Sequence, residues 1–298
     1  MRAERMGLLA LLVVTMVWGT TFPAMKLLSA HLDALQIIWL RFALALCVLA
    51  PLWVGMRAPE RLWGGLLGLL LFLAFWLQIE GLARTSSNRN AFVTGLNVLV
   101  VPLLAMAFLR RRYGWQLWAA CGMAFVGMAL MFHENEPWNL GDSLTLASTV
   151  FYAVYILLLE ECSRRTASHP LRATRMAAAQ AAVMCAASTA LLLARDGNLQ
   201  WMLSLSDLQV SSWLALVYLG LLASVVVVTL QAWGQQRVDA MRSAIVFGLE
   251  PVFAALTAWG LLGEQLGWAG LSGAALIVAA LVFSQVQPGR PATDPQHA

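Results

Sequence analysis

Long apolar runs, separated by short charged or turn-forming segments, are the dominant pattern along this 298-residue chain. Each run provides roughly the 20 apolar residues that an α-helix needs to cross a bilayer, and none shows the alternation of a membrane β-strand. The pattern predicts an all-α polytopic membrane protein with ten transmembrane helices. The predicted spans are residues 7–29, 33–54, 62–83, 91–109, 114–133, 141–160, 173–194, 211–233, 243–262 and 267–286.

The composition agrees with a membrane environment. The chain is 60% hydrophobic and 11% charged, with a mean hydropathy of +0.74, whereas soluble domains carry about 25% charged residues. Ten helices use nearly the whole length, which leaves no room for a soluble catalytic domain. The four cysteines form no CxxC pair, the four histidines lack metal-site spacing, and no phosphate-binding GxxxxGKS or GxxxxGKT motif occurs. We therefore expect no metal and no cofactor.

Basic residues are distributed unequally between the predicted loops. If the N-terminus is cytoplasmic, fourteen Arg lie on the cytoplasmic side and three on the other. Because cytoplasmic loops of membrane proteins hold the excess of Lys and Arg, both termini are expected in the cytoplasm. The net charge of +4 is thus interpreted as membrane topology rather than as nucleic-acid binding.

An internal repeat relates the two halves of the chain. At an offset of 153 residues, segment 78–115 matches segment 231–268 at thirteen of 38 positions, with Gln, Arg, Gly and Trp among the identities. The offset spans five predicted helices, an odd number, so the two halves cross the membrane in opposite directions. Inverted repeats around a central cavity are typical of secondary transporters, although a duplicated membrane domain without a transport role is the alternative. We expect a first repeat over 1–135, a second over 136–286 and a disordered cytoplasmic tail over 287–298.

Two charged residues are predicted at membrane depth, where a charge costs about 2.5–3.5 kcal/mol on insertion scales. Glu250 is followed by Pro251, so the ninth helix is expected to be broken there and to line a cavity. The repeat equivalent of Glu250 is Asn97. The alternative for Glu250 is a structural carboxylate, paired with an Arg or with backbone amides. Arg41, in the second helix, either holds a substrate carboxylate or pairs permanently with Glu250.

Aromatic and amide side chains are also predicted at membrane depth. Aromatic walls suit planar or amphipathic solutes, and buried polar groups on them need partners. A lining with few full charges favours a zwitterionic or moderately apolar solute over a polyanion. Core packing or lipid contact is the alternative explanation for each aromatic residue. The candidate substrate-binding residues are Trp18, Phe22, Trp39, Arg41, Trp76, Gln78, Asn97, Tyr152, Tyr155, Gln231 and Glu250.

Three segments resemble a known family. They are WGTTFPAMK at 18–26, LRF at 40–42 and LEPVFAALTAWGLLGEQL at 249–266. Together they resemble the paired EamA domains of the drug/metabolite transporter superfamily, over residues 5 to 286, and within it the chain is most similar to the YddG-type amino-acid exporters. The resemblance implies a central cavity between the halves, export of aromatic and other neutral amino acids from the cytoplasm, and a bacterial inner membrane.

These observations together predict a secondary transporter that exports amino acids, or similar small metabolites, by alternating access. An exporter of hydrophobic drugs or organic acids is one alternative. A membrane-embedded lipid-modifying enzyme is another, but the sequence contains no clustered nucleophile and base. The expected partners are a small-molecule substrate and the lipid bilayer, without nucleic acid, and this organisation is compatible with a monomer.

Overall fold

The computed structural model describes residues 2–131, 137–166, 171–198, 200–262 and 267–285. Within these ranges the chain folds into helices. Nine helical segments, some of them made of two or three consecutive helices, are long and apolar enough to cross a membrane, and the helix Trp115–Met131 is apolar but shorter. The predicted all-α membrane fold is therefore confirmed. The expected tail 287–298 lies outside the described residues.

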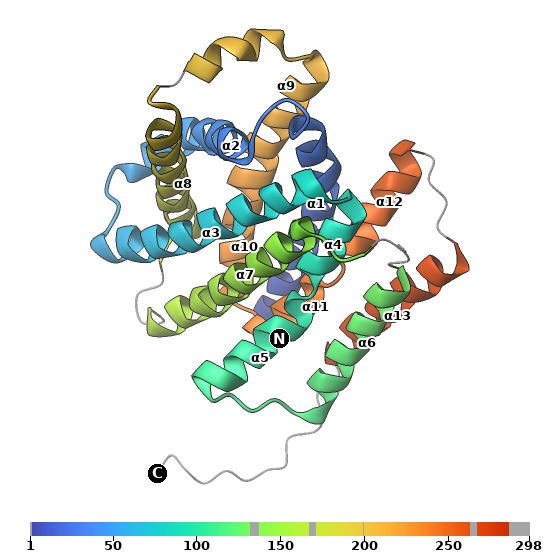
Figure 1. Ribbon diagram of the computed structural model, residues 1–298. Coiled ribbons are helices and arrows are strands. Elements are labelled where there is room, and N and C mark those ends of the chain that lie inside the picture. Colours follow the sequence, from blue (N-terminus) through green and yellow to red (C-terminus); the bar gives the residue numbers. More distant parts are fainter. Residues whose placement is uncertain (1, 132–136, 167–170, 199, 263–266, 286–298) are drawn as a thin grey trace.

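The helices follow the ten predicted spans in order (Figure 1). The first half consists of α1 (Arg2–Leu28), α2 (Ala34–Leu49), η1 (Ala50–Trp53), α3 (Ala58–Arg84), α4 (Ser87–Gly95), α5 (Asn97–Leu109) and α6 (Trp115–Met131). The second half consists of α7 (Leu140–Arg165), α8 (Ala173–Asp196), η2 (Gln200–Asp207), α9 (Val210–Val217), η3 (Tyr218–Val226), α10 (Val227–Gln235), α11 (Ala240–Phe247), α12 (Glu250–Leu262) and α13 (Trp268–Gln285).

The fourth and ninth predicted spans are each divided into two helices. Helix α11 ends at Phe247 and α12 begins at Glu250, so the ninth span is interrupted beside Glu250 as its sequence predicts. Pro251 is tolerated in the first turn of α12 because no intrahelical bond needs its missing N–H. The fourth span is interrupted at Leu96, which the sequence analysis did not predict. Because Leu96 and Leu249 are repeat equivalents, the break is a shared property of both halves.

Close glycine contacts extend the repeat to the first helix of each half. A Cβ on Gly7 of α1 would lie 3.1 Å from the backbone O of Gly234 on α10. A Cβ on Gly141 of α7 would lie 2.8 Å from the backbone O of Gly81 on α3. Since Gly81 and Gly234 are equivalent at the offset of 153, Gly7 and Gly141 are equivalent at an offset of 134. The two five-helix halves are thus related as inverted repeats.

Helices α6 and α13 form a separate pair at the edge of the bundle, where Figure 1 shows them side by side. Their backbones are in close contact, because a Cβ on Gly127 would lie only 2.6 Å from the backbone O of Gly273. Small residues permit this approach between helices in a membrane. The remaining helices surround the centre of the molecule, where the main hydrophobic core lies.

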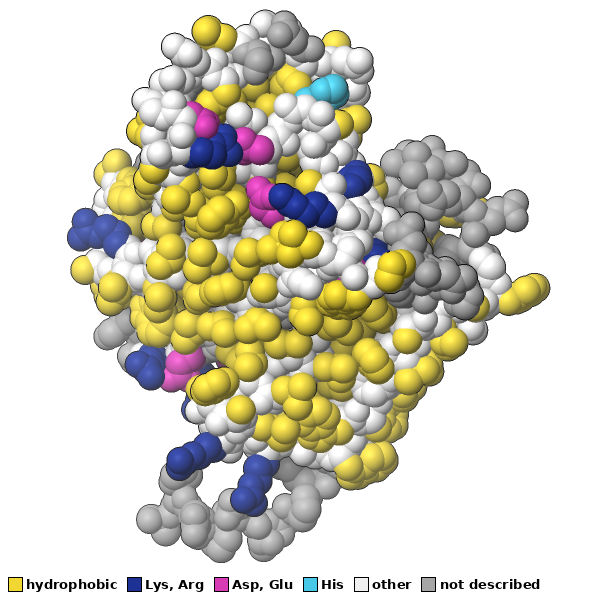
Figure 2. Space-filling model, in the orientation of Figure 1, with side chains coloured by type: hydrophobic (Ala, Val, Ile, Leu, Met, Phe, Trp, Pro, Cys, Tyr) yellow, Lys and Arg dark blue, Asp and Glu magenta, His cyan; other side chains and the backbone are white. Residues whose placement is uncertain are grey.

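The outer surface has the character expected of a lipid-facing protein. Figure 2 shows hydrophobic side chains across the middle of one face and charged side chains in separate groups, mostly above and below it. Large apolar side chains are freely exposed, such as Phe108 at 79% and Val282 at 63%. Lipid chains satisfy such a surface, because a spanning helix pairs its backbone groups internally and presents mainly apolar side chains.

Candidate functional site

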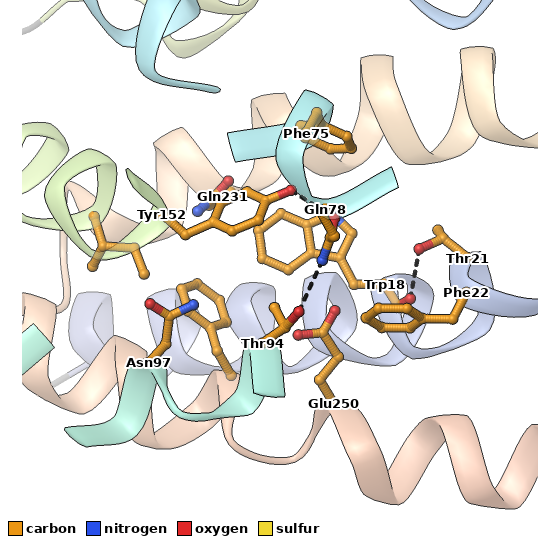
Figure 3. Close-up of a pocket in the computed structure, with 12 residues that line it drawn as sticks. Trp18, Thr21, Phe22, Phe75, Gln78, Thr94, Asn97, Tyr152, Gln231 and Glu250 are labelled. Carbon is orange, nitrogen blue, oxygen red and sulfur yellow. Dashed lines mark hydrogen bonds between the residues drawn. The ribbon is translucent and has the colours of Figure 1, made fainter. Parts of the chain in front are cut away.

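A cavity lies between the two halves, at the level of the two broken spans (Figure 3). It contains about 470 Å³ of space not filled by atoms, including its opening. Helices α1, α3, α4 and α5 of the first half and α7, α10, α11 and α12 of the second half contribute its walls. The lining residues are Trp18, Thr21, Phe22, Phe75, Gln78, Thr94, Asn97, Tyr152, Ile156, Gln231, Phe247 and Glu250.

Ten of the lining residues are repeat equivalents of one another. At the offset of 153 the pairs are Gln78 with Gln231, Thr94 with Phe247 and Asn97 with Glu250. At the offset of 134 they are Trp18 with Tyr152 and Phe22 with Ile156. Each half therefore supplies the same positions of its first, third and fourth spans, and the cavity lies on the axis that relates the halves.

The helix breaks place Asn97 and Glu250 in this cavity. Each is the first residue of the second helix of its span, α5 and α12 respectively. Both are nearly buried, with 6% of each residue exposed. Figure 3 shows the Glu250 carboxylate directed toward Thr94, Trp18 and Phe22. Interrupted helices that present polar groups at mid-membrane depth are a recurring way to build solute sites in transport proteins.

One wall of the cavity has a continuous hydrogen-bond chain. The Tyr152 hydroxyl donates to Gln78 Oε1 at 2.9 Å, and Gln78 Nε2 donates to Thr94 Oγ1 at 3.0 Å. These hydrogen bonds connect the second half to the first, because Tyr152 is on α7 while Gln78 and Thr94 are on α3 and α4. These polar groups satisfy one another, so this wall is preorganised.

Several other polar atoms of the cavity lack partners. Trp18 Nε1, Asn97 Oδ1 and Gln231 Oε1 are buried and make no hydrogen bond within the described part of the chain. No hydrogen bond or ion pair within those residues reaches the Glu250 carboxylate either. Buried polar groups are normally paired, and those left unpaired in a cavity commonly mark where a ligand binds.

Aromatic rings close much of the remaining surface. Trp18 and Phe247 face each other across the two halves with ring centroids 5.3 Å apart, and Phe75 lies 5.8 Å from Tyr152 in an edge-to-face arrangement. The cavity is therefore lined mainly by aromatic faces, with a few polar groups between them. This is the usual composition of a site for a small organic molecule.

Arg41 does not line the cavity and does not pair with Glu250. Its side chain is fully buried behind the Phe75 ring, with the guanidinium carbon 4.5 Å from the ring centroid. Arg41 Nε donates to Ser224 Oγ at 3.0 Å, while Nη2 has no partner among the described residues. The permanent Arg41–Glu250 pair that the sequence allowed is absent from the structure.

Three other candidate residues also lie away from the cavity. Trp39 donates from Nε1 to Thr189 Oγ1 at 2.8 Å, which ties α2 to α8. The Tyr155 hydroxyl donates to Gln180 Oε1 at 3.0 Å. Trp76 packs near Phe72 of the same helix, with ring centroids 6.0 Å apart. Seven of the eleven candidates therefore lie in one cavity, namely Trp18, Phe22, Gln78, Asn97, Tyr152, Gln231 and Glu250.

Five lining residues are not among those predicted from the sequence: Thr21, Phe75, Thr94, Ile156 and Phe247. Two of them carried a usable signal. Thr94 and Phe247 are repeat equivalents, each three positions before the equivalent pair Asn97 and Glu250. In an unbroken helix three residues is nearly one turn, so the sequence alone places them on the same side as that pair. The other three carried no such signal.

Comparisons with known proteins agree with this fold. The EamA-like transporter family matches residues 5–133 and 139–285. A protein of Escherichia coli K12 named as a probable amino-acid metabolite efflux pump is 28% identical over 297 residues, covering 93% of this chain and 94% of its own. An uncharacterized transporter of Archaeoglobus fulgidus is 25% identical over 275 residues, covering 92% of this chain and 84% of its own.

A solved crystal structure supports the same fold. It aligns with a TM-score of 0.70 at 18% identity and covers 95% of this chain and 97% of its own. An identity this low shows the fold alone. The two family matches together span nearly the whole chain, one in each half. The chain is a multi-pass membrane transporter rather than an enzyme, and it belongs to the EamA-like transporter family.

Proposed function

We propose that this transporter exports amino acids, aromatic and other neutral ones, or similar small metabolites from the cytoplasm by alternating access. The observation that carries the proposal is the cavity built from equivalent positions of two inverted halves. When such halves exchange conformations, a site on their common axis opens first to one side of the membrane and then to the other.

The lining supports a small, partly apolar solute. Aromatic rings provide faces for an apolar body, and the polar groups between them provide a limited number of hydrogen bonds. None of the described lining residues is Lys, Arg or His, which argues against a polyanion and against simple organic acids. The E. coli relative, named as a probable amino-acid metabolite efflux pump, supports the same solute class.

The direction of transport depends on the orientation in the membrane. We propose that both termini are cytoplasmic and that the membrane is a bacterial inner membrane. The fourteen-to-three distribution of Arg between the two sides supports this orientation. Arg57 and Arg195 lie at opposite ends of the bundle. Labelling Arg57→Cys and Arg195→Cys in whole cells with a thiol reagent that does not cross the membrane distinguishes the two orientations.

A transport assay in proteoliposomes tests the proposal. Purified full-length protein is supplied with a panel of neutral, acidic and basic amino acids, with and without an imposed pH gradient. We expect flux of aromatic and other neutral amino acids above that of empty liposomes. Absence of flux across the whole panel would overturn this proposal.

Hydrophobic drugs are the second candidate cargo. The five aromatic lining residues favour it: Trp18, Phe22, Phe75, Tyr152 and Phe247. The two candidates differ in what competes for transport. If drugs are the cargo, they should themselves be transported, and amino acids should compete with them poorly.

A further inference from the structure

We propose that one side of the cavity recognises the ammonium group of the cargo. Amines that have no carboxylate should therefore bind, whereas carboxylic acids that have no amine should bind poorly. We call Asn97, Gln231 and Glu250 the acceptor side. The inference rests on the proposed export function, whose cargo class it defines more narrowly. The inference is supported by buried acceptor atoms of these three residues that have no hydrogen-bond partner among the described residues. Such acceptors require a hydrogen-bond donor.

The orientation of the Gln231 amide follows from its neighbours. Gln235 Nε2 donates to the backbone O of Ile156 at 3.4 Å, which leaves Gln235 Oε1 as an acceptor. Gln231 Nε2 donates to that oxygen at 3.1 Å. Reversing the Gln231 amide would bring two oxygens together, so Gln231 Oε1 is the free end. This buried acceptor requires a donor.

The Glu250 carboxylate is the strongest element of the acceptor side. Only 6% of the residue is exposed, and no cation or N–H within the described residues reaches the carboxylate. A buried charge without compensation is costly, so the site favours a cationic partner that brings its own hydrogen-bond donors. A primary ammonium has three donors, so it can bond to the carboxylate and still donate to other acceptors of the cavity.

Asn97 completes the acceptor side from the other half of the molecule. Its Oδ1 is buried, and its amide makes no hydrogen bond among the described residues. Asn97 and Glu250 are repeat equivalents at the two helix breaks. The two breaks therefore present a neutral amide and a carboxylate to the same cavity, and the pair has the polarity of a cation site.

The cavity provides little for a carboxylate. The donors of Gln78 and Tyr152 are already used within the satisfied wall. The guanidinium of Arg41 lies behind the Phe75 ring, 4.5 Å from its centroid, so a solute in the cavity meets the ring first. Trp18 Nε1 is a buried donor without an acceptor, but it is a neutral group. The lining thus offers a full charge to an ammonium, whereas a carboxylate finds only neutral donors, namely Trp18 Nε1 and the Asn97 amide N–H groups.

The aromatic walls act in the same direction. The rings of Trp18 and Phe247, 5.3 Å apart, and of Phe75 and Tyr152, 5.8 Å apart, lie beside the acceptor side. Aromatic faces attract cations and repel anions because of their ring quadrupoles. The expected order of affinity is amine at or above amino acid, with the carboxylic acid far below both.

Three solutes with one ring and matched chain lengths test this order. They are 2-phenylethylamine, L-phenylalanine and 3-phenylpropionate, titrated into the detergent-solubilised full-length protein by isothermal titration calorimetry. We expect the amine to bind about tenfold or more tightly than the propionate, as a charge-assisted hydrogen bond would give. Equal binding of the amine and the propionate, or preference for the propionate, would overturn the inference.

Variants attribute the order to the acceptor side. In Glu250→Gln, amine binding should weaken about tenfold or more, to the level of the propionate. Glu80→Gln is the matched control, because Glu80 is a carboxylate on α3 that pairs with Arg84 outside the cavity. The double exchange Asn97→Glu with Glu250→Asn moves the carboxylate to the equivalent break and should restore the preference for the amine.

The outcomes separate the inference from the function on which it rests. If L-phenylalanine is transported but Glu250→Gln leaves the affinity order unchanged in a folded protein, the inference fails and export stands. If the amine binds with the expected order while no amino acid is transported, amino-acid export fails and ammonium recognition stands.

Discussion

The two halves of this transporter use opposite charges at equivalent places where a charged side chain connects two helices. We call each such place a joint. In the first half, Lys26 Nζ donates to the backbone O of Leu82 and of Thr85, each at 2.7 Å, where α3 ends and α4 follows. In the second half, the residue 134 positions later is Glu160, which accepts from the backbone N of Ala240 at 3.1 Å, where α11 begins after α10. Lys26 thus binds the end of a helix, as Glu160 does.

Both joints follow the same electrostatic rule. A cation is favourable beside the carbonyl end of a helix, and an anion is favourable beside its N–H end. Lys26 meets the carbonyl end of α3, whereas Glu160 meets the N–H end of α11. The comparison shows that both halves keep the position of the joint and a hydrogen bond from a side chain to the helix end. The charge of that side chain differs between the halves.

A second pair of joints differs in burial rather than in sign. Arg89 of α4 pairs with Asp142 of α7, Nε to Oδ1 at 2.6 Å, and the two side chains are 5% and 0% exposed. Its repeat equivalent, Arg242 of α11, pairs with Glu4 of α1, with side chains 19% and 32% exposed. Each pair ties the fourth span of one half to the first helix of the other, so both joints hold the halves together.

The largest expected effect breaks the buried joint. Asp142→Asn removes the carboxylate from Arg89 in a site shielded from water, and Thr85 Oγ1 also contacts that carboxylate at 3.2 Å. We expect the variant to lose about 3–5 kcal/mol of stability. Glu4→Gln, at the more exposed joint, should lose at most about 1 kcal/mol. Thermal unfolding of both variants in detergent measures the difference, and equal losses would contradict it.

The next effect concerns the close helix contacts of the two halves. A Cβ on Gly81 would lie 2.7 Å from the backbone O of Gly141, which cannot move aside easily. A Cβ on Gly234 would meet Leu11 Cδ2 at 2.8 Å, the end of a flexible side chain. Gly81→Ala should therefore cost about 1–3 kcal/mol and Gly234→Ala less. Gly122→Ala is the control, because nothing lies within 4 Å of its Cβ position.

The charged joints should respond more weakly. Lys26→Met leaves two carbonyl groups at the end of α3 without their donor, and we expect a loss of about 1–2 kcal/mol. Glu160→Gln keeps an acceptor for Ala240 and loses only the charge opposite Arg111, so its loss should be smaller. Lys26→Arg, which retains donors, should recover part of the stability in the same unfolding measurement. A Lys26→Met protein as stable as the wild type would show that the cap contributes nothing.

Sequence alone predicted the spans and the inverted repeat because both are periodic signals that a single chain carries. Apolar length marks the helices, and the match at an offset of 153 marks the halves. It could not separate Trp18, which lines the cavity, from Trp39, which bonds to Thr189 on α8. Both are aromatic residues at membrane depth, and only helix packing decides which direction each one faces.

Arg41 was the clearest case of this ambiguity, and its equivalent in the second half suggests what it does. A Cβ on Gly220 would lie 3.1 Å from the backbone O of Arg41, and a Cβ on Gly68 would lie 3.1 Å from the backbone O of Gln180. Arg41 on α2 thus contacts a glycine of the third span of the other half, as Gln180 on α8 does. The two positions share this backbone contact, yet one holds a charge without an ion-pair partner among the described residues and the other a neutral amide.

The smallest effect is expected from Arg41→Gln, which gives position 41 the same residue type as Gln180. In Arg41→Gln the loss of the hydrogen bond to Ser224 and of the contact with Phe75 is offset by removing a fully buried charge, so stability should change by about 1 kcal/mol or less. The protein should remain monodisperse, which a size-exclusion profile and an unfolding curve would establish. If the variant unfolds, the charge itself holds α2 against η3. If it stays folded but no longer transports amino acids, Arg41 acts on the cargo, and Phe75 must move aside during the cycle.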